Sequence, residues 1–164
     1  MCSSDLHFFE SKWLGSFDGD NTMSLDGWVM NSNHADSKNL LLQMDIEGSE
    51  YNCLLAASDS ILARFRIIVV EFHMLSAIQS SRFLNGRFLP VLHKLLRHFD
   101  CVHAHANNCL PACEIYGYKV PEVIELTFYR KDLNAGPQKA WRPSPLDVLN
   151  VPGHEPLHLG APWI

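Results

Sequence analysis

Short apolar runs and helix-periodic segments alternate through the middle of the chain. Residues 40–44 form an apolar run that stops at Asp45, and residues 66–72 form a second run that is rich in β-branched side chains. Residues 101–106 are a third candidate strand. Because the first run stays apolar over the length of a strand, it predicts a strand buried on both faces, as in a parallel sheet.

Two segments repeat their apolar side chains with the period of a helix. One follows Gly48 over residues 51–62, and its first turn includes Glu50, which we expect to interact with the helix dipole. The other covers residues 88–99, and residues 73–85 before it are expected to be a loop. Its apolar stripe consists of Phe88, Leu92, Leu95, Leu96 and Phe99.

A last strand is predicted over residues 124–129, where apolar and polar side chains alternate. No helical crossover precedes it, so we expect it to be antiparallel to its neighbours. The order strand, helix, strand, helix, strand before it favours right-handed βαβ units. The fold class is therefore α/β, a sandwich with a mostly parallel sheet and an antiparallel last strand.

The 164 residues fit one domain in three parts. Residues 1–38 are a polar N-terminal segment, in which Thr22 or Ser24 is a candidate N-cap for a short helix. Residues 39–132 carry the α/β pattern. Residues 133–164 are a tail with six prolines, which predicts an extended segment on the surface or partial disorder.

Composition narrows the functional classes. Hydrophobic residues make up 47% of the chain and charged residues 19%, which favours a packed core over disorder. The net charge of −5 argues against nucleic acid as a partner, because phosphate binding requires clustered Lys and Arg. No apolar run reaches membrane-spanning length and no signal peptide is visible, so a cytoplasmic location without a membrane partner is the default expectation. Five cysteines are an odd number for a set of disulfides, so we expect reduced thiols in a cytosol-like compartment.

Polar, ionisable side chains follow the predicted strands. Asp45 and Glu47 follow the first, Glu71 and His73 end the second, and the pair Asn107–Asn108 follows the third. Ligands of open parallel sheets bind outside the carboxyl ends of the strands, so these groups are expected to converge on one cleft. There the carboxylates would position or deprotonate a substrate. The alternative is that strands end at the surface, where polar residues are ordinary.

A second group combines His103 and His105 with Cys109 and Cys113. Four such side chains could hold structural zinc. However, the spacing differs from a C-x2-C knuckle and Pro111 restricts the loop, so packing against a helix explains the group as well. We therefore assign no metal site.

Several segments in order resemble the FkbM-type S-adenosylmethionine-dependent methyltransferases. LLLQMDIEGSEYNCL resembles the family's fourth-strand motif, with Gln43 where Lys is usual. The likeness covers roughly residues 13–153. Its other segments are TMSLDGW, IIVVEFH, HAHANNC, VPEVIELTFYRKD and PSPLDVLNVPG.

The resemblance implies a Rossmann-like fold that transfers a methyl group from S-adenosylmethionine to an oxygen of a small molecule or sugar. It implies that Asp45 and Glu47 lie beside the methyl donor and acceptor, and that Glu71 and His73 line the same cleft. One of the carboxylates would act as general base. The sequence does not distinguish which one, nor which acceptor is used.

The family's Gly-rich cofactor loop has no counterpart, since the chain contains no G-x-G-x-x-G. The chain resembles the C-terminal half to two-thirds of the domain, so we expect it to be incomplete or inactive by itself. One sheet edge would then be exposed, which predicts self-association or a missing N-terminal portion as partner. The alternative function is a non-catalytic remnant that binds another chain through this edge.

Overall fold

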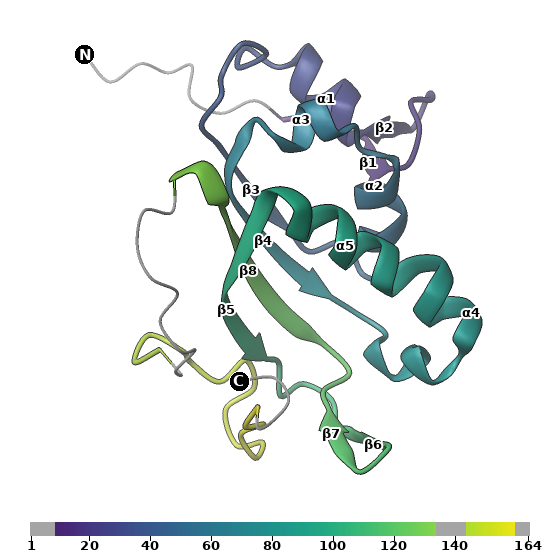
Figure 1. The fold of residues 1–164 in the computed structure, drawn as a ribbon, viewed down its shortest axis with the longest axis vertical. Helices are drawn as coiled ribbons and strands as arrows, with labels where there is room; N and C mark the ends of the chain where they lie inside the picture. Colours follow the sequence, from purple (N-terminus) through teal and green to yellow (C-terminus); the bar gives the residue numbers. More distant parts are fainter. Residues whose placement is uncertain (1–8, 134–143, 160–164) are drawn as a thin grey trace.

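A four-stranded sheet organises the protein, in the order β3, β4, β8, β5 (Figure 1). The computed structural model describes residues 9–133 and 144–159. The strands of the sheet are β3 (Leu40–Met44), β4 (Phe65–Phe72), β5 (Phe99–Ala106) and β8 (Ile124–Arg130). Two small two-stranded sheets consist of β1 (Trp13–Gly15) with β2 (Thr22–Ser24), and β6 (Cys113–Ile115) with β7 (Tyr118–Val120).

The main sheet is mixed rather than mostly parallel. Strands β3 and β4 are parallel, whereas β8 lies between β4 and β5 and runs antiparallel to both. The antiparallel direction of the last strand is thus confirmed. Because this strand lies between β4 and β5, β3 and β4 are the one pair of parallel neighbours left in the main sheet. The chain reaches β8 from β5 through the β6–β7 hairpin instead of a crossover helix, and antiparallel pairing is the outcome that such a connection permits.

The helices gather on one face of the sheet, and α5 crosses in front of it in Figure 1. Their buried side chains and those of alternate strand positions form one core. The α-helices are α1 (Leu25–Asn31), α2 (Glu50–Ala56), α3 (Asp59–Leu62), α4 (Ser81–Phe83) and α5 (Leu89–His98). Other helical turns are Leu75–Gln79, Leu84–Phe88 and Lys131–Leu133, so most of the expected loop at 73–85 is helical.

The two faces of the sheet differ in burial. On β3, Leu42 and Met44 are buried in the core, but Leu41, directly before Leu42, is 64% exposed. The expectation that this strand is buried on both faces is therefore wrong for the described residues. An apolar run specifies a strand, but helices cover only the face that carries the alternate positions.

The polar segments at both ends of the chain are tied to the sheet domain. Of the two N-cap candidates Thr22 and Ser24, the structure selects Ser24, which accepts a hydrogen bond from the Gly27 amide at 2.9 Å at the start of α1. In the tail, the Asn108 amide donates to the Val151 carbonyl at 3.0 Å. Residues 144–159 contain no helix or strand. The predictions for 1–8, 134–143 and 160–164 lie outside the described residues.

No helix in the described ranges has both the length and the apolar character needed to cross a bilayer.

Leu95 provides a test of the core. Its side chain is fully buried where α5 joins the core, whereas its neighbour Leu96 is 40% exposed. Leu95→Ala is expected to lower the free energy of unfolding by about 2–5 kcal/mol, because it removes buried apolar contacts and leaves a cavity. Leu96→Ala is the matched control, with an expected change within about 0.5 kcal/mol. Urea unfolding curves measure both, and equal effects would contradict this packing of α5.

Candidate functional site

The turn that follows β3 is organised by a buried carboxylate. Glu50, in the first turn of α2, is fully buried. Its Oε1 accepts hydrogen bonds from the backbone amides of Ile46 and Gly48, each at 3.1 Å. Glu47 within this turn has φ +54°, a conformation that costs a non-glycine residue free energy, and Gly48 has φ +98°. The turn thus holds its residues in one strained geometry.

The same carboxylate fixes the end of β4. Glu50 Oε1 lies 3.0 Å from His73 Nδ1, and the neighbouring Tyr51 hydroxyl donates to the His73 carbonyl at 2.7 Å. Burial raises the pKa of the Tyr51 hydroxyl far above its ordinary value, so it remains a donor. Met74, directly after His73, also adopts a left-handed φ of +62°. Two consecutive residues of α2 therefore set the position of the histidine.

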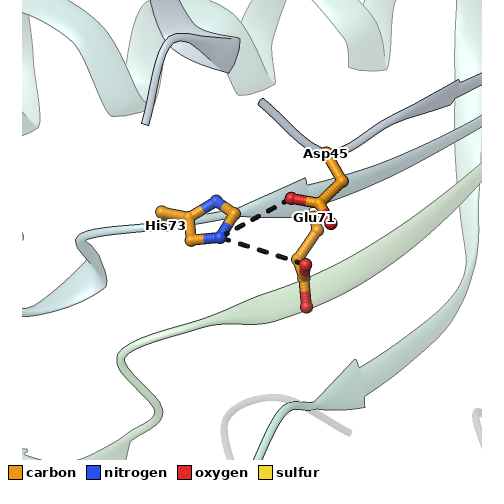
Figure 2. Close-up of side chains that lie close together, drawn as sticks. All are labelled: Asp45, Glu71 and His73. Carbon is orange, nitrogen blue, oxygen red and sulfur yellow. Dashed lines mark ion pairs between the residues drawn. The ribbon is translucent and has the colours of Figure 1, made fainter. Parts of the chain in front are cut away.

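The four site residues predicted from the sequence lie together at the ends of β3 and β4. We call Asp45, Glu47, Glu71 and His73 the strand-end cluster. His73 Nε2 lies 3.7 Å from Asp45 Oδ1, 3.4 Å from Glu47 Oε2 and 3.9 Å from Glu71 Oε2. Figure 2 shows the ring nitrogen facing the carboxylates of Asp45 and Glu71. The Glu47 side chain is 85% exposed and lies at the rim, whereas that of Asp45 is 43% exposed.

Glu71 is the most constrained carboxylate of the strand-end cluster. Asn107, just after β5, donates from Nδ2 to Glu71 Oε1 at 2.6 Å. Burial raises the pKa of the Glu71 carboxyl above its usual range; the Asn107 hydrogen bond opposes this rise and the charge of Asp45 adds to it. Glu125 on β8 pairs with Glu71 in the sheet register. The site therefore concentrates negative charge at one end of the sheet.

A cavity of about 440 Å³ adjoins the strand-end cluster, and Asp45 belongs to both. Its volume lies within the range of small-molecule sites. Its apolar side includes Leu14, Met23 and Trp28, and its polar side includes Lys12. These residues come from the polar N-terminal segment, including β1, β2 and α1. Part of this segment therefore lines a cavity large enough for a small ligand.

The histidines and cysteines of the second group have other partners. His103 Nε2 lies 2.9 Å from Asp147 Oδ1 in the tail, and Cys113 Sγ lies 3.5 Å from the Val120 carbonyl. Within the residues that the structure describes, Asp45, Glu71 and His73 are the one group of three or more potential ligands close enough for a metal ion. The zinc alternative on His103, His105, Cys109 and Cys113 is thus not supported.

Sequence reasoning missed the role of one residue of the site, Glu50. Glu50 looks like an ordinary helix-dipole partner, and only its full burial reveals that it joins two strand ends. The pattern in the sequence that could have indicated this role is the position of Glu50 two residues after Gly48, where a carboxylate can accept hydrogen bonds from the amides of the turn. Asn107 was among the strand-end groups expected to converge, and it contacts Glu71 because β4 and β5, both antiparallel to β8, end at the same edge.

Comparison with known proteins gives one match. The family model of the methyltransferase FkbM domain matches residues 18–120, which is more than half of the chain and includes the strand-end cluster. No curated protein and no solved structure matches this sequence significantly.

Gly48 provides a test of the turn. A Cβ at this position would lie 3.2 Å from Met74 Sδ, and the left-handed φ of +98° would strain any other side chain. Gly48→Ala is expected to cost about 1–3 kcal/mol of stability. Gly86→Ala is the matched control, because Gly86 is helical with open space around its Cβ position, and a gain of about 0.5–1 kcal/mol is expected. Thermal unfolding measures both; a neutral Gly48→Ala would contradict the constrained turn.

Proposed function

Because the chain belongs to the FkbM methyltransferase family, we propose that it transfers a methyl group from S-adenosylmethionine to an oxygen of a small molecule or sugar. The observation that carries this proposal is the convergence of Asp45, Glu71 and His73 at the ends of two parallel strands, beside a ligand-sized cavity. We also propose that the sheet is part of a Rossmann-like fold, in which ligands bind at this edge.

The cavity has side chains that suit the methyl donor. Trp28 and Met23 offer apolar surface for a flat base, and Asp45 offers a carboxylate to hydroxyl or ammonium groups. Glu47 lies at the rim of the strand-end cluster, where its negative charge would attract a cationic ligand. When bound, S-adenosylmethionine supplies an electrophilic methyl group on a positively charged sulfur. We propose Asp45 and Glu47 as the cofactor-binding residues.

The strand-end cluster suits the acceptor side of the reaction. A hydroxyl that transfers its proton to a carboxylate as it attacks becomes a better nucleophile, so Asp45, Glu47 or Glu71 would act as general base. Asp45 belongs to both the cavity and the cluster and is therefore near both ligands in this proposal. His73 and Asn107 constrain the carboxylates, and such positioning contributes to the rate as well.

Binding of the donor tests the proposed function. Calorimetric titration of the chain with S-adenosylmethionine in EDTA is expected to give one site per chain. Asp45→Asn is expected to weaken binding about ten-fold or more, because a charge-assisted hydrogen bond contributes about 1.5–3 kcal/mol. Asp36→Asn, at an exposed position on another part of the surface, is the matched control. No binding to a folded chain, or equal binding by all three proteins, would contradict the proposal.

A second function is favoured by the sheet edge. Strand β3 is an edge strand of the described sheet, and Leu41 on it is exposed. Exposed edge strands pair with strands of other chains. We therefore propose, as the alternative to catalysis, a binding module that pairs through β3 with another copy or another chain.

Sedimentation measured across protein concentrations tests the edge. Association is expected to increase with concentration, and Leu41→Lys is expected to weaken it because a charged side chain would lie in the new interface. Leu146→Lys adds the same charge at an exposed position in the tail and is expected to have no effect. A monomer at every concentration would contradict the binding module.

A further inference from the structure

We propose that Asp45, Glu71 and His73 bind a divalent transition-metal ion. Their potential ligand atoms, one from each side chain, all lie within 4.8 Å of one another. They come from the ends of two hydrogen-bonded strands, so the sheet itself determines their spacing. This goes beyond the proposed methyl transfer and does not depend on it.

The distances from His73 to the two carboxylates suit an ion between them better than direct hydrogen bonds. Charge-assisted hydrogen bonds to a carboxylate are about 2.7–2.9 Å long. His73 Nε2 lies 3.7 Å from Asp45 Oδ1 and 3.9 Å from Glu71 Oε2, beyond that length (Figure 2). A zinc-sized ion holds tetrahedral donor atoms roughly 3.4 Å apart, so the two distances from His73 exceed that separation by only about 0.3–0.5 Å.

Glu50 prepares His73 as a ligand. Glu50 Oε1 already accepts two backbone amides, which leaves His73 Nδ1 as the donor in their 3.0 Å contact. Nε2 then carries the lone pair and faces Asp45 and Glu71. Metal-binding histidines characteristically donate their other ring N–H to a carboxylate in this way, because the bond fixes the tautomer and the ring orientation.

Asn107 orients the carboxylate of Glu71 as a ligand, as Glu50 orients the ring of His73. Its amide holds Oε1 at 2.6 Å, and the oxygen that faces His73 is the other one, Oε2. Two of the three ligands therefore have an atom fixed by an outer partner and a second atom directed at the common point. A group of strand ends that is polar only because it meets solvent has no reason to be oriented by outer partners such as Glu50 and Asn107.

The charge at the site is unbalanced. Among the described residues, the carboxylates of Asp45, Glu47, Glu50 and Glu71 have His73 as their one basic neighbour in these contacts, and no Lys or Arg side chain forms an ion pair with them. Glu50 Oε2 is also buried without a hydrogen-bond partner. A bound divalent cation would offset this excess, and it would often be the largest charge in such a site. One imidazole with two carboxylates favours Mn²⁺ or Zn²⁺ over Mg²⁺, which prefers an all-oxygen shell.

Titration with Mn²⁺, followed by the electron paramagnetic resonance signal of the free ion, tests the site in the full chain. One Mn²⁺ per chain is expected, displaced by Zn²⁺ more readily than by Mg²⁺. Asp45→Asn and His73→Gln are each expected to weaken binding at least ten-fold. Asn107→Ala is expected to weaken it about 10–100-fold through Glu71. The Asp45 side chain is partly exposed to solvent, so of these variants Asp45→Asn is expected to disturb folding least.

Matched controls are Asp36→Asn and His93→Gln, which change the same residue types at exposed positions away from the site. Both are expected to bind Mn²⁺ like the unchanged chain, and circular dichroism verifies that every variant is folded. Absence of bound Mn²⁺ and Zn²⁺ from the folded chain would overturn the metal site, as would equal losses in site and control variants. Because the S-adenosylmethionine titration is performed in EDTA, failure of that binding and failure of the metal site are separate results.

Discussion

The contacts of Glu50 are the constraint on which the site depends. One buried carboxylate oxygen receives the amides of Ile46 and Gly48 from the turn after β3 and the imidazole of His73 from the end of β4. Burial of an unpaired carboxylate costs several kcal/mol, whereas each hydrogen bond to a charged group contributes about 1.5–3 kcal/mol, so all three donors are needed to offset the burial. The helix start, the turn and the histidine are consequently positioned together.

The strained backbone beside this carboxylate follows from the same contacts. Glu47 and Met74 both have left-handed φ angles, one in the turn after β3 and one just after β4. Such conformations persist only where the surroundings enforce them, and they are typical of functional sites. Here the amides of the turn and the imidazole of His73 converge on one oxygen, and Glu47 and Met74 lie next to the groups that make these contacts. The strained backbone at Glu47 and Met74 therefore lies within the site, which supports a functional role for these strand ends.

The sequence predicts the elements better than their arrangement. The apolar runs locate β3 and β4, the alternation locates β8, and the stripe of α5 buries Leu95, because each depends on local periodicity. The exposure of Leu41 and the position of β8 between β4 and β5 depend on which face the helices cover and on strand pairing, which no local pattern encodes. The grouping of Asp45 and Glu71 was predictable, since parallel neighbours end at the same edge. The burial of Glu50 was not, because a first-turn Glu is ordinarily at the surface.

Asp45 joins the two halves of the proposed chemistry. It faces His73 and Glu71 on one side and the cavity with Trp28 and Lys12 on the other. The proposed methyl transfer requires that a donor and an acceptor meet at one point, and the cavity and the strand-end cluster meet at this residue. The sheet supports this geometry because β3 and β4 are parallel neighbours, so their carboxyl ends lie at the same edge. Strand β8 leaves that pair intact, and because β4 and β5 are both antiparallel to β8, β5 ends at the same edge, where Asn107 contacts Glu71.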